Sequence, residues 1–391
     1  MTAHTTHDIA AMVRDAVRDG ASVRAVGSGT WLSGGPVAHD AAARTLHPTG
    51  GVIAYTPGDL VISVHAGTTM QELADITGIE GQMLALAPYG SPQSTIGAVV
   101  ATASAAPLAY DDLTVRDLVL GMTVVTGTGD VVHPGGTVVK NVAGFDLVRL
   151  HTGAFGMLGI LTAVSLRLHA APHMDHVVTG TLDDAPEQWV PRLIANRAPL
   201  PMLVRLAPDE PAQLFARCTG NTARATALRG LVQAAGARDT FTLGPSDTGA
   251  SGTHETPAAM LRHVAPDALV LRARTQPSHG AALIAQARHH FPEATVLFQP
   301  SRGTVRITVP APRAHGDIGT KAEAERDADA RVAAFIAGAT TAAGAAVSVV
   351  VEQGAAPCRD AHPLDAAIKR SLDPHGVLPH RRAVPPVPFR S

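Results

Sequence analysis

Three turns built from small residues are the parts of this sequence whose backbone is best suited to bind a charged ligand. They are Gly27 to Thr30, Ser94 to Gly97, and a stretch from Gly153 to Ile160 whose glycines are three residues apart. Glycine lets the backbone approach a ligand closely, and successive N–H groups with nearby hydroxyls can hold a phosphate. The turns therefore predict a site for a phosphorylated ligand. The alternative at each is an ordinary turn or helix cap, because a single glycine motif is a weak signal.

Two common nucleotide-binding fingerprints are absent from the first turn. Gly27-Ser28-Gly29 is followed by Thr30-Trp31-Leu32, so the spacing G-x-G-x-x-G is not formed. The pattern G-x-x-x-x-G-K-S/T is also missing. The turn therefore predicts neither a Rossmann fingerprint nor a P-loop.

The elements that must position these turns alternate between helix and strand. Apolar spacing predicts a helix over 7–18 that ends at Gly20, and a strand over 22–26 that runs into the first turn. Thr69 and Glu72 form a capping box, and Ser94 is expected to cap a helix that begins at Thr95. Further elements are predicted as strands over 52–55, 60–65, 116–125 and 161–168 and as helices over 70–77 and 145–150.

The pattern changes after Pro172. Strands and helices then follow in the order β-α-β-β-α-β, which is typical of a ferredoxin-like α+β domain. The Gly- and Ser-rich segment 243–256 is expected to be an exposed loop, and 310–328 a loop or linker.

The composition excludes several classes of partner. The chain has 391 residues, which favours two domains, and 46% of them are apolar, which indicates an ordered globular protein. The formal net charge is −2, without a basic run, and this argues against nucleic acid or an anionic membrane as the main partner. Aromatic residues make up 3%, too few for a surface on which single-stranded bases stack.

The two cysteines and the N-terminal residues favour a reducing compartment. Cys218 and Cys358 form neither a disulfide framework nor a C-x-x-C motif, so we expect small buried apolar side chains. The N-terminal segment is too polar for a signal peptide, and no apolar run approaches ~20 residues. A cytoplasmic protein without a membrane span is predicted.

Four segments carry a resemblance to a known family. They are VRAVGSGTWLSGG, PQSTIGAVVATASA, VRDLVLGMTVVTGTGDVV and GGTVVKNVAGFDLVRLHTGAFGMLGIL, in this order between Val23 and Leu168. Together they resemble the FAD-binding domain of the PCMH type, in the vanillyl-alcohol-oxidase superfamily. Within it they are most similar to the FAD-binding subunits of glycolate oxidase, and KNVAGFD with the following LHTGAFGMLG is the most specific part.

The resemblance implies an α+β fold in three parts. Residues 1–172 would form a PCMH-type FAD-binding domain of two α+β subdomains, and 173–352 a ferredoxin-like α+β cap on the substrate side. Residues 353–391 would return to the FAD domain and end in a loose tail. Lys369, Asp373, Pro374 and Gly376 fit the closing motif of the family. Leu378 and His380 stand where Asn and Gly are usual.

The resemblance also implies roles for the three turns. Gly27, Ser28, Gly29 and Thr30 would hold the pyrophosphate of FAD. Ser94, Thr95 and Gly97, with Thr102 and Ser104 nearby, would contact phosphate and the ribityl chain. Gly153, Gly156, Gly159 and Ile160 would wrap the adenine and the flavin. No histidine is placed for a covalent link, so non-covalent FAD is expected. Ala98, Ala103, Ala106 and Phe155 replace the Gly, Asn, Gly and Glu that are usual in the family.

The activity that follows from the resemblance is oxidation of a small 2-hydroxy acid to a 2-oxo acid by an FAD-binding subunit of a glycolate oxidase complex. A larger catalytic flavoprotein subunit and an iron–sulfur subunit are the implied partners, and through them the chain would lie at the inner face of the membrane. Two alternatives stay open. One is a self-sufficient FAD-linked hydroxy-acid dehydrogenase, and the other is a structural subunit that kept the fold and lost its flavin.

No metal site is predicted, and no catalytic residue is assigned. Related dehydrogenases carry H-x-G-D-G-N-x-H in the cap, whereas this chain has residues 301–306 there without a histidine pair. Arg302 and Arg306 are expected to alternate on one strand face, where they would hold a substrate carboxylate. Solvated charges on a strand are the alternative interpretation.

Overall fold

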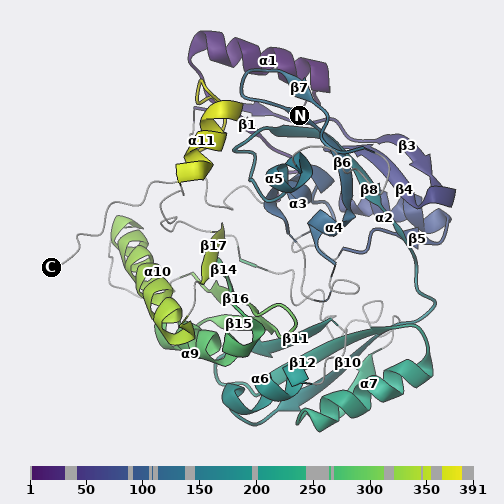
Figure 1. Cartoon of the computed structure of the whole chain (residues 1–391), viewed down its shortest axis with the longest axis vertical. Helices are drawn as coiled ribbons and strands as arrows, with labels where there is room; N and C mark the ends of the chain where they lie inside the picture. Colours follow the sequence, from purple (N-terminus) through teal and green to yellow (C-terminus); the bar gives the residue numbers. More distant parts are fainter. Residues whose placement is uncertain are drawn as a thin grey trace.

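The computed structural model describes residues 2–30, 42–86, 91–104, 108, 113–136, 146–195, 201–243, 264–265, 268–311, 321–344, 347–353 and 363–380. Several sequence predictions lie outside this part of the chain: residues 137–145 with most of the KNVAGFD motif, Ala106, the loop over 244–256, Cys358 and the tail beyond 380. Figure 1 shows an upper unit formed by the first elements and a lower unit formed by the later ones, with the last helix back at the upper unit.

A five-stranded antiparallel sheet forms the centre of the upper unit. Its strand order is β3-β4-β8-β6-β7, with the bounds β3 (Val52–Thr56), β4 (Val61–His65), β8 (Ile160–Arg167), β6 (Val119–Val125) and β7 (Val131–Val132). Alternate residues such as Ile62, Val64 and Val164 are buried, as a half-buried strand requires. They form one core with Leu73 and Ile96, which come from α2 (Met70–Ile79) and α3 (Ile96–Thr102).

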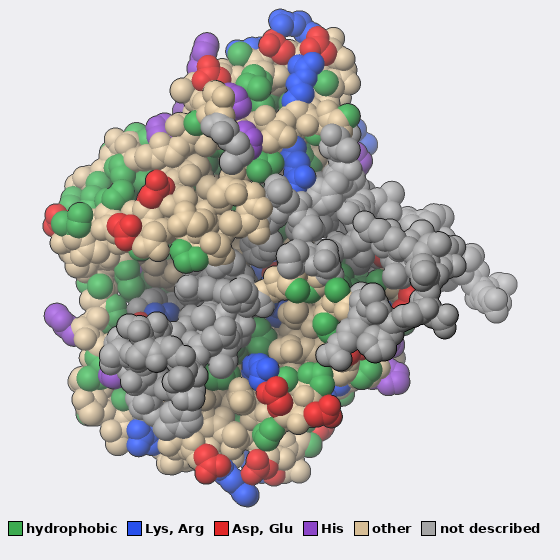
Figure 2. Space-filling model, turned by 180° about the vertical axis from the view of Figure 1, so that it is seen from behind, with side chains coloured by type: hydrophobic (Ala, Val, Ile, Leu, Met, Phe, Trp, Pro, Cys, Tyr) green, Lys and Arg blue, Asp and Glu red, His purple; other side chains and the backbone are tan. Residues whose placement is uncertain are grey.

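Helix α1 (Thr6–Asp19) covers a parallel strand pair, β1 (Val23–Ala25) and β2 (Arg44–Leu46). Thr5 and Asp8 form a capping box, and Gly20 ends the helix in the left-handed region with φ 63°. The apolar face of α1 packs with β1 and β2 in a separate small core. The predicted helix and its stop are confirmed. Basic and acidic side chains intermix over α1 (Figure 2), consistent with the near-neutral net charge.

The lower unit is built on an eight-stranded antiparallel sheet of order β13-β10-β12-β11-β15-β16-β14-β17. The strands are β10 (Asp175–Leu182), β11 (Met202–Leu206), β12 (Ala212–Thr219), β13 (Arg238–Leu243), β14 (Leu269–Arg274), β15 (Thr295–Gln299), β16 (Thr304–Val309) and β17 (Ser348–Gln353). The helices α6 (Pro186–Ala195), α7 (Thr222–Ala234), α9 (Gly280–His290) and α10 (Lys321–Ala343) pack on one face and share the largest core. The expected β-α-β-β-α-β order thus occurs twice, first over β10 to β13 and then over β14 to β17.

Four local predictions are corrected by the structure. Thr95 rather than Ser94 caps α3, because its side chain accepts from the N–H of Ala98. Residues 115–118, which include the start of the strand predicted over 116–125, form a short helix, α4 (Val115–Leu118), before β6. Asp117 accepts hydrogen bonds from Thr114 at the N-terminal end of this helix. Helix α10 begins within the segment predicted as a loop. Strand β13 was not predicted, and its last residue lies in the segment expected to be a loop.

The chain returns to the upper unit at its C-terminal end. Helix α11 (Pro363–Leu372) lies beside α1 and β1 in Figure 1. The last residue of α11 and the segment that follows each accept a backbone hydrogen bond from this unit, Gly127 N to Leu372 O at 2.9 Å and Val23 N to Val377 O at 2.8 Å. Val377 and Leu378 are buried in the small core beneath α1. The domain boundaries at 172 and 352 stay a prediction.

The two units meet at the face of the large sheet that its helices leave uncovered. Leu108 of the upper unit is buried among Leu203, Phe215 and Leu297. Arg217 donates to the carbonyl of Leu108 at 2.8 Å. Because Leu297 lies between two residues buried toward the helices, it belongs to the opposite face of the sheet. In the part of the chain that the structure describes, no helix is long and apolar enough to cross a membrane.

Candidate cofactor site

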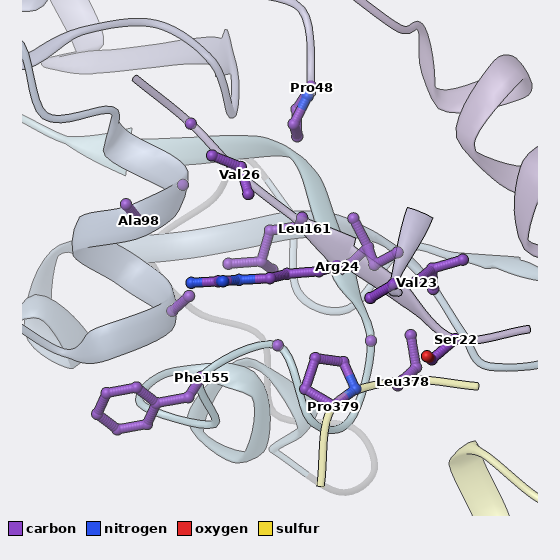
Figure 3. Close-up of a pocket in the computed structure, with 18 of the residues that line it drawn as sticks. Ser22, Val23, Arg24, Val26, Pro48, Ala98, Phe155, Leu161, Leu378 and Pro379 are labelled. Atoms are coloured by element: carbon purple, nitrogen blue, oxygen red, sulfur yellow. The ribbon is translucent and has the colours of Figure 1, made fainter. Parts of the chain in front are cut away.

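A cavity of about 430 Å³ opens between the first glycine turn, α3, the loop before β8 and the C-terminal segment. Figure 3 shows side chains converging on it from these different parts of the chain. Its volume falls in the range of small-molecule sites, ~300–1,000 Å³. It is thus a candidate for the predicted site of a phosphorylated ligand.

Ten of the thirteen residues predicted to bind the cofactor line this cavity. They are Gly27, Ser28, Gly29, Thr30, Thr95, Gly97, Thr102, Gly156, Gly159 and Ile160. The other three, Ser94, Ser104 and Gly153, lie outside its lining. Ser94 is directly behind the first turn, since its hydroxyl is 2.9 Å from that of Thr30. Ser104 is buried, and its hydroxyl has no hydrogen-bond partner among the residues that the structure describes.

The first turn is fixed against the second by contacts between their side chains. A side chain at Gly27 would place its Cβ 2.2 Å from the hydroxyl of Thr95, so only glycine fits there. The hydroxyl of Ser28 donates to the carbonyl of Gln93 at 2.5 Å. Gly29 takes a φ of 76°, which favours glycine. The two hydroxyls of this turn therefore join the turns together, and the backbone is left to face the cavity.

Helix α3 forms one wall, and its glycine is explained by packing. A Cβ on Gly97 would come within 2.8 Å of Ala66, so the residue lets α3 lie close to the strand end beside it. The hydroxyl of Thr102 donates to the carbonyl of Ala98 at 2.8 Å inside the helix. The small side chains on this helix therefore keep the wall close to the sheet.

The loop over 153–159 closes the C-terminal end of α3. Gly153 N donates to Val100 O at 3.0 Å, and Phe155 N donates to Ala101 O at 2.8 Å, so both carbonyls gain partners. Gly156 has a φ of 73°, and a Cβ there would meet nothing within 4 Å. A Cβ on Gly159 would lie 2.3 Å from Val124. Gly156 thus keeps space open, whereas Gly159 is required by packing.

The C-terminal segment supplies a further wall, and its residues were not among those predicted to bind the cofactor. Residues 375–380 line the cavity. Asp373 is fully buried and accepts from Val377 N at 3.0 Å and from Leu378 N at 3.1 Å. Lys369 donates to Asp373 and also to Met157 O at 2.7 Å, which belongs to the loop before β8. Burial lowers the pKa of Lys369, and Asp373 opposes that shift. The pair fixes the C-terminal wall to the glycine loop.

Arg24 is a further residue of the cavity that was not predicted from the sequence. It lies on β1 and lines the cavity. A basic residue between Val23 and Ala25, in a strand that runs into a glycine turn, was the available signal. Figure 3 shows its side chain extending across the cavity, with Leu161 on one side and Phe155 and Pro379 on the other.

A buried histidine lies behind the glycine loop. His151 is 3% exposed, and burial lowers its pKa to about 4. A Cβ on Gly159 would lie 3.3 Å from its ring. The imidazole is therefore neutral at pH 7, and its position indicates a packing role.

The predicted arginine pair has a different geometry from the expected one. Arg302 lies in the turn before β16, so it does not share a strand face with Arg306. Arg306 is buried and donates to Glu352 at 2.7 Å, and Arg272 is 3.2 Å from the other oxygen of Glu352. Burial opposes the ionisation of Glu352, but the two arginines outweigh it and lower the pKa. Arg272 also donates to Ala103 O at 3.4 Å, across the two units.

Comparison with known proteins gives the class of this chain. Residues 1–135 match the family model described as an FAD binding domain, and the cavity is lined largely by that region and by the loop that follows it. Residues 1–135 therefore carry an FAD binding domain, and FAD is the cofactor. The residues around the cavity fit such a ligand, because turns of small residues leave backbone and open space at its wall.

Individual relatives are similar over part of the chain. It is 40% identical over 124 residues to glycolate oxidase subunit GlcE of Escherichia coli (strain K12), covering 31% of this chain and 35% of that protein. It is 31% identical over 171 residues to a D-lactate dehydrogenase of Anaerostipes hadrus, covering 44% and 36%. The match therefore spans about a third of each relative.

Solved structures support the fold over nearly the whole chain. A chitooligosaccharide oxidase superposes with a TM-score of 0.67 at 14% identity, covering 95% of this chain and 88% of that one. An alkyldihydroxyacetonephosphate synthase gives 0.64 at 13% identity, covering 96% and 74%. At these identities the likeness shows the fold alone.

Proposed function

We propose that this chain is the FAD-binding subunit of a complex that oxidises a 2-hydroxy acid, with glycolate as the first candidate, to a 2-oxo acid. The names of the relatives support this proposal, because glycolate and lactate are both 2-hydroxy acids. The chain would act as a CH–OH oxidoreductase within the complex.

The convergence of the three predicted turns on one cavity carries the proposal. Residues separated by more than a hundred positions line the same space. Bound FAD would supply the two-electron chemistry. The first turn would hold its diphosphate through backbone N–H groups, and the open position at Gly156 would admit its bulk. The C-terminal wall would exclude water from that side.

The substrate side of the proposal concerns the large sheet. Arg272 and Arg306 surround Glu352 on the face of the sheet directed toward the upper unit. Because two arginines face one glutamate, this cluster carries one net positive charge. A carboxylate of a hydroxy acid is the anion that such a pair of guanidinium groups would bind. Arg306, with Arg272 beside it and Arg302 in the preceding turn, is the candidate substrate-binding group.

The assembly is proposed from the names of the relatives. Glycolate oxidase subunits GlcE and GlcD occur among them. A larger catalytic flavoprotein subunit and an iron–sulfur subunit would complete the complex, and the chain would reach the inner face of the membrane from the cytoplasm through them. The second candidate is a self-sufficient dehydrogenase, which the similarity to D-lactate dehydrogenases favours.

A purified chain distinguishes these functions. We expect it to be yellow, with flavin absorbance that glycolate bleaches anaerobically only when the partner subunits are added. Bleaching by glycolate or D-lactate without partners would support the self-sufficient enzyme. A folded protein that takes up no FAD after reconstitution would refute both and would leave the structural subunit as the remaining function.

A further inference from the structure

We propose that Arg24 is the residue that neutralises the diphosphate of FAD and thereby sets the preference of the cavity for the dinucleotide. The inference rests on the proposed function only in taking FAD as the ligand of this cavity. It adds a residue, and a source of selectivity, that the glycine turns do not provide.

The position of Arg24 follows from the alternation of strand β1. Val23 is 1% exposed and packs into the core beneath α1. The next side chain of a strand points to the opposite face, and Figure 3 shows the side chain of Arg24 extending across the cavity. Gly27 begins the diphosphate turn three positions further on. Arg24 is therefore held by the same segment of backbone that forms the turn.

The charge of the described cavity wall is positive. Among the residues described along this wall, Arg24 is the only Lys or Arg, and the wall has no Asp or Glu. His375 and His380 lie on the wall formed by the C-terminal segment. A diphosphate carries two negative charges, and a guanidinium matches its oxygens with two parallel donors.

The chemistry of Arg24 agrees with an anionic ligand. Burial lowers the pKa of its guanidinium, yet arginine stays protonated in proteins at neutral pH. An apolar residue would serve packing alone in this strand. Figure 3 shows the guanidinium reaching toward helix α3 at Ala98, into the space that a ligand would occupy.

This role predicts that Arg24 contributes to cofactor affinity only through the diphosphate. Riboflavin shares the ring system and ribityl chain of FAD but lacks the diphosphate. Replacing Arg24 should weaken FAD binding and leave riboflavin binding unchanged. The dependence of FAD affinity on salt should fall as well, because one charge pair is lost.

The test compares Arg24→Gln, Arg24→Lys and the control Arg18→Gln by titration of the flavin-depleted chain with FAD and with riboflavin. Arg18 lies exposed on α1, so its replacement changes the net charge equally. We expect Arg24→Gln to weaken FAD binding by roughly tenfold to a hundredfold. Arg24→Lys should keep part of the affinity, and Arg18→Gln should match the wild type.

Each outcome decides between defined alternatives. Equal weakening of FAD and riboflavin by Arg24→Gln would overturn the proposal in favour of a packing role, and so would unchanged FAD binding. If Arg24→Gln does not fold, the salt dependence of flavin affinity is measured in the wild type and in Arg24→Lys instead. The proposal is refuted if FAD affinity falls with salt no more steeply than riboflavin affinity does. A wild type that binds neither flavin refutes the cofactor site itself.

Discussion

At the scale of single residues, the glycines of the site divide by what surrounds them. Gly27, Gly97 and Gly159 have neighbours that leave no room for a Cβ, so packing explains them. Gly156 combines a φ of 73° with empty space on its side-chain position. It is therefore the glycine of the third turn whose replacement would fill the cavity rather than disturb the core.

Gly156→Leu should lower FAD affinity by about tenfold or more, because the side chain would occupy the cofactor site. Gly81 gives a matched control, since it has a φ of 62° with nothing within 4 Å and lies away from the cavity. Both variants should lose about 1–3 kcal/mol of stability from backbone strain. Flavin titration and thermal unfolding measure the two effects. Equal flavin loss in both variants would contradict the assignment of Gly156.

His151 predicts a pH dependence of stability. Its pKa falls from 6.5 in the unfolded chain to about 4 in the folded one, so the unfolded state binds the proton first. The neutral, buried His151 contributes about 3 kcal/mol to the free energy of unfolding above pH 6.5. This contribution is lost as the pH falls toward 4. Urea unfolding at several pH values should show a shallower loss in His151→Gln. The exposed His7→Gln should keep the wild-type slope, and an unchanged slope in His151→Gln would disprove this origin.

At the scale of elements, the C-terminal segment depends on one buried ion pair. Lys369→Met would leave the fully buried Asp373 without its cation and would free Met157 O. We expect a loss of about 3 kcal/mol, faster FAD release and earlier proteolysis near α11. Stopped-flow flavin fluorescence and limited proteolysis provide the readouts.

The neighbouring residue supplies the control for this ion pair. Arg370 follows Lys369 on α11 but is exposed. Arg370→Met should therefore leave both FAD release and cleavage as in the wild type. If Lys369→Met released FAD at the wild-type rate while folded, the segment would not be needed to retain the cofactor.

Local sequence rules predicted some elements well because the determining residues are neighbours. The α1 stop at Gly20 and the capping box of α2 need only short-range contacts. The choice between Ser94 and Thr95 as the cap of α3 was beyond such rules. Ser94 contacts Thr30, which is 64 residues away. Helix α4 has four residues, too few to show a helical period.

The parts of the candidate site that contain glycine turns were predicted from the sequence. The parts that depend on contacts between distant residues were not. The three turns are visible in the sequence because backbone conformation restricts their residue types. The wall over 375–380 depends on a buried pair whose spacing, Lys369 to Asp373, is common on helices. Arg302 was placed on a strand because the turn at Gly303, with a φ of 58°, could not be located from composition.

At the scale of the whole molecule, the two units are joined through Leu108 and the charged groups around it. Leu108→Ala should destabilise the chain by about 2–3 kcal/mol and separate the unfolding of the two units, because it leaves a cavity in their contact. Calorimetry of the holoprotein checks this. Leu147→Ala, at an exposed position, should shift stability by less than about 0.5 kcal/mol. A single sharp transition at the wild-type temperature in Leu108→Ala would argue against this coupling.

The wall at residues 375–380 also sets when the holoprotein can form. A ribosome makes the first glycine turn early and this wall only after more than 370 residues have been joined. A nascent chain therefore cannot enclose the dinucleotide before residues 375–380 have been made.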